Sequence, residues 1–89
     1  MITVLFFGQL ADIATHELGQ SELTLPLPED LAEITLDDLR LELGNKSAKL
    51  AEAVNKPSNL CAINQVLTNE NVMIINNDEV AFMSPLSGG

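Results

Sequence analysis

The sequence predicts an α+β domain in which a mixed sheet of four to five strands carries its helices on one face. Two observations lead to this prediction. The chain has 89 residues, 46% of them hydrophobic, which is enough for one core and too little for a second domain, so we expect a single domain over residues 1–89. Its apolar pattern also changes between strand and helix periods, in the order strand, strand, helix, strand, strand.

The first predicted strand covers residues 2–7, a continuous run of mostly apolar, β-prone side chains. Such a run is typical of a strand in the interior of a sheet. Because side chains alternate between the two faces of a strand, Val4 and Phe6 would share one face, and Leu5 and Phe7 the other.

A short helix and an edge strand are expected next. Apolar residues after Gly8 keep helical spacing, and Gly19 is a suitable helix stop. Residues 22–27 then place leucine at every second position, which indicates a half-exposed strand. Pro26 has no N–H to donate, so this strand should lie at the edge of the sheet.

The main helix is predicted to begin at Thr35, which is a good N-cap with Asp38 at the capping-box position. Leucines follow at helical spacing, and Gly44 is expected to end the helix. A further short helix over residues 47–54 should be ended by Pro57.

Three more strands are expected, over residues 60–65, 72–75 and 79–83. Residues 76–78 are a turn signal, because Asn and Asp tolerate left-handed backbone and bond to their own main chain. This order of elements is that of the β-grasp, or ubiquitin-like, fold, which leaves one sheet face without helices. That face needs either polar side chains or a partner.

The charge restricts the partners. A formal net charge of -9 comes from 13 acidic and 4 basic residues. Such a chain repels a phosphate backbone, so nucleic acid is not an expected partner. The same acidity would steer the protein toward a basic protein surface, or would simply keep a small protein soluble.

Cysteine usage and the N-terminal residues predict a cytoplasmic protein. Cys61 is the only cysteine, so the sequence lacks the disulfide framework that is typical of small secreted domains. The apolar start at residues 1–7 has no basic segment and is too short for a signal peptide or a membrane span. No association with a membrane is expected.

Few side chains are suited to catalysis. His16 stands alone in a helix and is expected to be exposed, while Cys61 in a strand is expected to be a small buried hydrophobe. The acidic pairs at 37–38 and 78–79 fit a helix N-terminus and a turn. The sequence has neither metal-ligand spacing nor a glycine-rich phosphate loop, so we expect no metal, no bound cofactor and no enzyme activity of the chain on its own.

Residues 84–89 are expected to form a flexible tail that ends in Gly88-Gly89, because nothing after Pro85 has a period that would pack. Glycine has no Cβ, so such an ending can pass down a narrow channel and present a terminal carboxyl at its far end. A frayed terminus without function is the alternative that this feature alone leaves open.

Several segments together resemble the small subunits of molybdopterin synthase, a family of ubiquitin-like sulfur carriers. Residues 78–89 are similar to the closing strand and tail of that family, residues 2–10 to its first strand and helix start, and residues 62–65 to its third strand. The turn at 76–79 sits where the family turns into its last strand. One departure is the run Phe82-Met83-Ser84-Pro85, where the family commonly has two aromatic residues and then two prolines.

The resemblance implies a carrier cycle at the C-terminal carboxyl of Gly89. A ubiquitin-activating-type adenylyltransferase would adenylate this carboxyl with ATP and magnesium, and a sulfur donor would convert the adenylate into a thiocarboxylate. The tail residues would then enter a large subunit, where sulfur passes to cyclic pyranopterin monophosphate. These residues are Pro85, Leu86, Ser87 and Gly88. The carrier would be the non-catalytic subunit of a heterotetramer.

Phe7 and Met83 are the candidate interface with that large subunit, because in a β-grasp sheet they lie on neighbouring strands and share the helix-free face. Other functions remain open. A thiamine-type sulfur carrier would share the tail chemistry, whereas a non-covalent ubiquitin-like adaptor would have an inert tail. Conjugation to a lysine of another protein is a further alternative.

Overall fold

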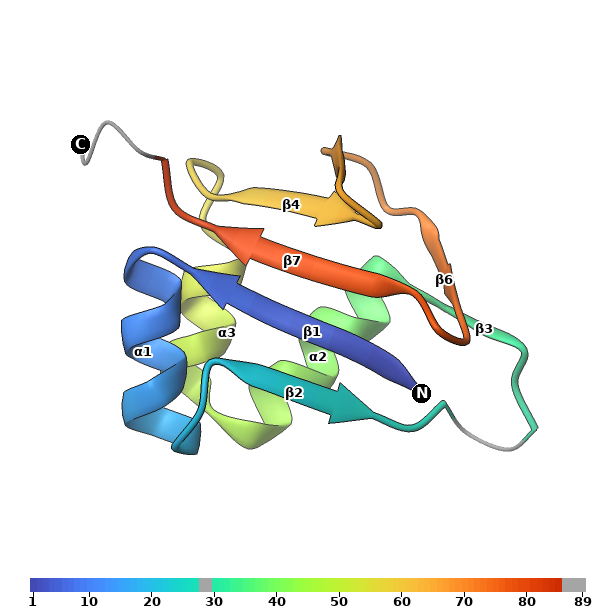
Figure 1. Ribbon diagram of the computed structural model, residues 1–89, viewed down its shortest axis with the longest axis horizontal. Coiled ribbons are helices and arrows are strands. Elements are labelled where there is room, and N and C mark those ends of the chain that lie inside the picture. The colour runs from blue at the N-terminus through green and yellow to red at the C-terminus, as the bar shows by residue number, and fades with distance from the viewer. Residues whose placement is uncertain (28–29, 86–89) are drawn as a thin grey trace.

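The structure of the protein, a computed structural model, describes residues 1–27 and 30–85. Figure 1 shows the arrangement of the helices and strands along this part of the chain. In order they are β1 (Ile2–Phe7), α1 (Gln9–Leu18), β2 (Glu22–Leu25), β3 (Glu33–Thr35), α2 (Leu36–Lys46), α3 (Ala48–Val54), β4 (Leu60–Ile63), β5 (Val66–Thr68), β6 (Met73–Ile75) and β7 (Glu79–Met83).

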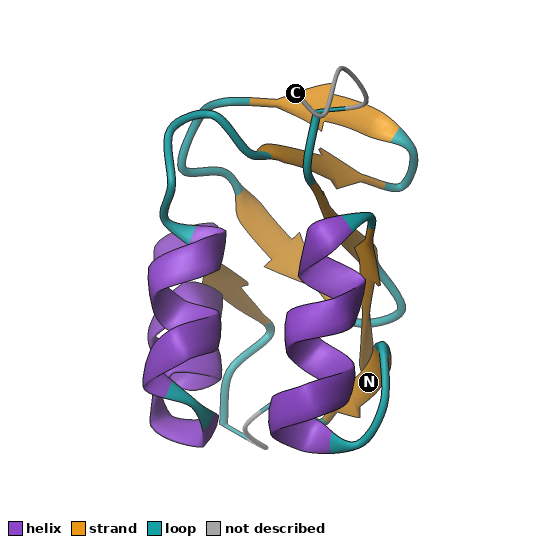
Figure 2. Cartoon of the chain, turned by 90° about the vertical axis from the view of Figure 1, so that its left-hand side faces the viewer, coloured by secondary structure: helices purple, strands orange, loops and turns teal. Residues whose placement is uncertain are grey.

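Within the described residues, five strands form one mixed sheet in the order β2-β1-β7-β4-β5. β1 and β7 run parallel, whereas the other neighbouring pairs are antiparallel. The three helices lie together on one side of this sheet, which curves around them (Figure 2). The predicted α+β class and β-grasp arrangement are therefore confirmed.

The positions of the first two strands also agree with the predictions. β1 lies inside the sheet, between β2 and β7, as its continuous apolar run indicates. β2 lies at one edge, although it ends at Leu25, one residue before Pro26. The middle of the sheet is β7, so the strand that leads to Ser84 and Pro85 is held on both sides.

A second, two-stranded sheet pairs β3 with β6, with Ile34 opposite Ile74. The strand predicted over residues 72–75 is confirmed as β6, whereas the sequence prediction has no counterpart of β3. Three residues are too few to display an alternating pattern, and β3 exists because its partner lies about forty residues further along the chain.

α2 begins as predicted and ends later than predicted. The Thr35 hydroxyl accepts a hydrogen bond from the Asp38 N–H at 3.1 Å, and the Asp38 carboxylate accepts one from the Thr35 N–H at 3.3 Å. These two bonds form the expected capping box. The prediction that Gly44 ends the helix is wrong, because α2 continues through Gly44 to Lys46.

Gly44 allows α2 and α3 to pack closely. A Cβ atom at this position would lie 3.2 Å from the Cβ of Ala51, which is tighter than an ordinary contact. Ser47 ends α2 and begins α3: its N–H donates to the Leu43 carbonyl at 3.0 Å, and its Oγ accepts from the Leu50 N–H at 3.1 Å. The short helix predicted over residues 47–54 is confirmed with Ser47 as its N-cap.

β4 and β5 form a hairpin in place of the single strand predicted over residues 60–65. β4 ends at Ile63, and Asn64 and Gln65, with φ of 50° and 70°, make the two-residue turn into β5. Positive φ at both positions matches the twist that a tight hairpin needs.

The core lies between the helices and one face of the sheet. Phe6 and Phe82, from the parallel strands β1 and β7, stack there with ring centroids 6.0 Å apart. The other buried members of the core are Ile2, Val4, Leu10, Ala14, Leu23, Leu36, Leu39, Leu43, Leu50, Ala53, Val54, Cys61, Ile74 and Val80. Because strand side chains alternate, the remaining half of each central strand faces away from the helices.

The longest described helix, α2, has 11 residues. Over residues 1–27 and 30–85, no helix combines the length and the apolar character that a membrane crossing requires.

Candidate functional site

The sheet face away from the helices carries apolar side chains in two rows that follow the strand register. One row consists of Leu5, Ala81, Ala62 and Leu67, on β1, β7, β4 and β5. The second row consists of Phe7, Met83 and Leu60, on β1, β7 and β4. We call these seven residues the open-face patch. None of them belongs to the core cluster on the helix side.

Several patch side chains are large and exposed. Phe7 is 48% exposed, Leu60 43% and Leu67 62%, while Ala62 and Ala81 are buried between their neighbours on the strands. Leaving large apolar side chains in water is unfavourable, and a contiguous group of them marks an interaction surface. The predicted pair Phe7 and Met83 lies in direct register on this face, so the patch is the candidate partner surface.

A hollow of about 600 Å³ opens beside the second row of the patch. Its lining residues are Phe7, Gly8, Gln9, Leu60, Met83, Ser84 and Pro85. The hollow connects the open-face patch with residues 84–85, which we call the tail root. A partner side chain that entered it would touch the patch and the tail root together.

A second hollow, of about 360 Å³, also includes the tail root in its lining and extends toward α1 and the end of α3. Its lining residues are Gln9, Leu10, Ile13, Ala53, Lys56, Ser58, Asn59, Ser84 and Pro85. Lys56 is one of only 4 basic residues in the chain, so a carboxylate of a partner would be favoured here. The tail root thus borders a mostly apolar hollow and one that carries a positive charge.

The tail root is half-buried and is attached to α1. The Gln9 N–H donates a hydrogen bond to the Ser84 Oγ at 3.0 Å, across 75 positions of sequence. The remaining residues of the predicted tail, Leu86, Ser87, Gly88 and Gly89, lie outside the described residues. Their roles, including that of the Gly89 carboxyl, stay predictions.

His16 and Cys61 have the surroundings that the sequence predicts. The His16 side chain is 79% exposed, as expected. Cys61 is buried, also as expected, and burial raises the pKa of its thiol, with the Arg40 charge opposing that rise. A protonated, buried thiol is a poor nucleophile. In the part of the chain that the structure describes, no group of three His, Cys, Asp or Glu side chains gathers in a way that could hold a metal ion.

The two acidic pairs also act as local anchors. The Asp78 carboxylate accepts a hydrogen bond from the Ile75 N–H and another from the Asn64 Nδ2, each at 2.9 Å. Asp37, in the first turn of α2, pairs with Arg40 at 3.2 Å. These contacts agree with the turn and helix-terminus roles predicted for the two pairs.

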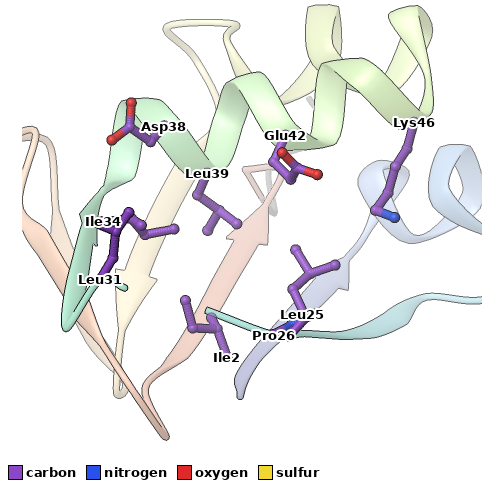
Figure 3. Close-up of a pocket in the computed structure, with 9 residues that line it drawn as sticks. All are labelled: Ile2, Leu25, Pro26, Leu31, Ile34, Asp38, Leu39, Glu42 and Lys46. Carbon is purple, nitrogen blue, oxygen red and sulfur yellow. The ribbon is translucent and has the colours of Figure 1, made fainter. Parts of the chain in front are cut away.

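A third hollow, of about 510 Å³, lies between α2 and the start of β1 (Figure 3). Leu39 points from α2 toward the sheet, and Asp38 and Glu42 lie on the same helix. The Asp38 carboxylate is already bound in the capping box. Ile2 lines this hollow and Phe7 lines the one at the tail root, at opposite ends of β1, roughly 17 Å apart for a strand of this length. The two hollows are therefore separate.

Sequence reasoning identifies Phe7 and Met83 but misses Leu60, Leu67 and Ser84. Leu60 shares the face of Met83 only because β4 pairs with β7 in a register that the sequence does not reveal. Leu67 reaches the patch through the hairpin turn at residues 64–65. The Ser84 contact joins segments 75 positions apart, and no local sequence pattern predicts it.

Known proteins resemble the chain over its whole length. A sequence model of the ThiS family matches residues 4–89. The chain is 36% identical to the molybdopterin synthase sulfur carrier subunit of Haemophilus influenzae and 30% identical to the subunit of the same name from Escherichia coli, each over 89 residues that cover 100% of both proteins. Among solved structures, SAMP1 from Haloferax volcanii has a TM-score of 0.76 at 18% identity, covering 99% of this chain and 98% of that one. This structural likeness supports the fold alone.

Proposed function

The chain belongs to the ThiS family, and from that premise we propose that it is the sulfur carrier subunit of a molybdopterin synthase. The observation that carries the proposal is the 36% identity, over the full length of both chains, to a protein of that name. Such a subunit is not an enzyme on its own. It brings the reacting sulfur to a catalytic partner.

The carboxyl of Gly89 must be activated before it can accept sulfur, because oxide is a poor leaving group. In the proposed cycle an adenylyltransferase of the ubiquitin-activating type joins AMP from ATP to this carboxyl and releases pyrophosphate. A sulfur donor then displaces AMP and leaves a thiocarboxylate. ATP and magnesium belong to the activating enzyme, and the ATP requirement favours a cytoplasmic site for the reaction.

Delivery follows loading. Residues 85–88 enter the active site of the large subunit, and the thiocarboxylate of Gly89 gives its sulfur to cyclic pyranopterin monophosphate. Two such transfers supply the dithiolene of molybdopterin, and each returns the carrier as a carboxylate. An ending of two glycines suits a narrow channel, because neither residue has a Cβ.

The open-face patch is the proposed docking surface for the large subunit. Its second row, with Phe7 and Met83, adjoins the tail root, so docking there would place the tail at the mouth of the partner's active site. The net charge of -9 would speed encounter with a basic surface around a site for a phosphorylated pterin. We expect a heterotetramer with a dimer of large subunits at its centre.

Loading can be tested with the purified chain, ATP, magnesium, an activating enzyme and a sulfur donor. Intact-mass analysis should show replacement of one oxygen by sulfur. Addition of the large subunit and the pterin precursor should return the original mass and yield molybdopterin. A variant without Gly89 is the matched control and should stay unchanged in both steps.

Other results would contradict the proposal in distinguishable ways. An unchanged mass for the complete chain would favour the non-covalent adaptor. Sulfur transfer to a thiazole synthase, with none to the pterin precursor, would favour the thiamine-type carrier. A larger adduct on a lysine of another protein would indicate conjugation.

A further inference from the structure

The tail root and α1 are joined by a hydrogen bond that is unusual for a helix start. The first N–H groups of a helix have no partner within the helix, and an N-cap side chain commonly accepts from the second or third of them. The N-cap of α1 is Gly8, which makes no side-chain cap. Ser84 supplies an acceptor for the first of these N–H groups, from the end of β7, with its Oγ 3.0 Å from the Gln9 nitrogen.

The fit between Gly8 and Ser84 is close. Phe7 and Met83 are partners in parallel register, so the residues that follow them also lie side by side. A Cβ atom on Gly8 would stand 2.2 Å from the Ser84 Oγ. Gly8 also has φ 64° and ψ -137°, a region that residues with side chains rarely adopt. Any side chain at position 8 would therefore displace the hydroxyl from Gln9.

We propose that Ser84 is a positioning residue whose hydrogen bond to α1 sets the direction in which the tail leaves the domain. This role rests on the sulfur-carrier function proposed above. Ordering a free backbone residue during binding carries an entropic cost, and a residue already held in place avoids it. Pro85 follows directly, with φ restricted by its ring. The hydroxyl and the ring together make the tail root stiff where it borders both hollows.

Three substitutions separate this role from simple capping of α1. Ser84→Ala removes the acceptor for Gln9 and frees residue 84. Ser84→Thr keeps a hydroxyl at the same position. Ser84→Pro restricts the backbone through a ring and offers no acceptor, and the extended Met83 before it tolerates a following proline.

The test compares the thiocarboxylated wild type and the three variants in single-turnover sulfur transfer to the pterin precursor, with the large subunit fixed and the carrier varied. Ser84→Ala should raise the half-saturating carrier concentration roughly threefold to tenfold and leave the limiting rate unchanged. Ser84→Thr should match the wild type. Ser84→Pro should recover most of the affinity.

Amide exchange of Gln9, measured by NMR, gives a readout that does not depend on sulfur transfer. The amide should be protected in the wild type and in Ser84→Thr, and should exchange faster in Ser84→Ala and Ser84→Pro. Melting curves establish that each variant is folded. If Ser84→Ala is unstable, the comparison of Ser84→Pro with Ser84→Thr still separates restriction of the backbone from the hydrogen bond of the hydroxyl.

The outcomes distinguish the two proposals. No sulfur transfer from the wild type would overturn the sulfur-carrier function and this role with it. A wild-type half-saturating concentration for Ser84→Ala, combined with faster Gln9 exchange, would show that Ser84 only caps α1. A fall in the limiting rate alone, or a Ser84→Pro variant as weak as Ser84→Ala, would also overturn the positioning role.

Discussion

Asn64 and Glu79 are joined by a closed pair of hydrogen bonds. The Asn64 N–H donates to the Glu79 carbonyl at 2.7 Å, and the Glu79 N–H donates to the Asn64 Oδ1 at 2.9 Å. This pair ties the turn of the β4–β5 hairpin to the first residue of β7. A slip of β7 by one residue would turn Met83 to the helix side of the sheet. The pair therefore helps to keep Met83 in the open-face patch, on the side away from the helices.

We predict that Asn64→Ala lowers the free energy of unfolding by about 1–2 kcal/mol, since two side-chain hydrogen bonds are lost. Alanine also tolerates the φ of 50° less well than asparagine does. Urea denaturation provides the measurement. The control is Asn69→Ala, at an exposed position after β5, which should change stability by less than about 0.5 kcal/mol. Equal losses in the two variants would contradict the role of the Asn64 side chain.

The open-face patch predicts the effect of charge on partner binding. Phe7→Asp and Met83→Asp should each weaken binding to the large subunit about tenfold or more, measured by titration calorimetry, because a carboxylate would be desolvated at the centre of the interface. Melting temperatures should stay near that of the wild type. Leu41→Asp is the matched control, since Leu41 is 69% exposed on α2, on the helix side of the sheet. Loss of the fold in Phe7→Asp would show that the two faces of the sheet are assigned the wrong way round.

The contribution of the capping box at the start of α2 to the free energy of unfolding should be measurable with single substitutions. Thr35→Ala removes the acceptor for the Asp38 N–H and should lower the free energy of unfolding by about 1 kcal/mol. Thr35→Ser keeps the hydroxyl and should retain most of that stability. Similar denaturation midpoints for the alanine and serine variants would indicate that the hydroxyl contributes little.

The burial of Cys61 predicts that the free energy of unfolding falls at alkaline pH. Burial raises the pKa of its thiol above the ordinary value of 9.0, so the folded state holds the thiol proton more tightly than the unfolded state does. The stability that this provides is present below the ordinary pKa and is lost as the pH rises through the folded value. Above pH 9.0, the unfolding free energy of the wild type should therefore fall more steeply than that of Cys61→Ala. Parallel pH profiles would rule out this linkage.

The elements that sequence analysis predicted correctly are those whose signals are local. The Thr35 capping box is contained in four residues, and its two hydrogen bonds form as expected. Pro26 predicts an edge strand because a missing N–H has the same consequence in any sheet. The continuous apolar run of residues 2–7 predicts an interior strand for the same kind of reason.

The predictions that are wrong or missing concern elements whose structure depends on residues far away in the sequence. Gly44 has the appearance of a helix stop, but the close approach of Ala51 explains the glycine, and that contact depends on how α2 and α3 pack. β3 and β5 have three residues each and are strands only because β6 and β4 lie beside them. The candidate site divides in the same way, since alternation identifies Phe7 and Met83 while Leu60 and Ser84 depend on register and on a contact across the fold.

The parallel pairing of β1 with β7 has a consequence for biosynthesis. Residues 3–7 find their partners in residues 79–83, so the middle of the sheet cannot close until the chain as far as Met83 has left the ribosome. A nascent or truncated chain that stops short of Met83 has no completed sheet, and each folded copy that meets another protein has been synthesised at least that far.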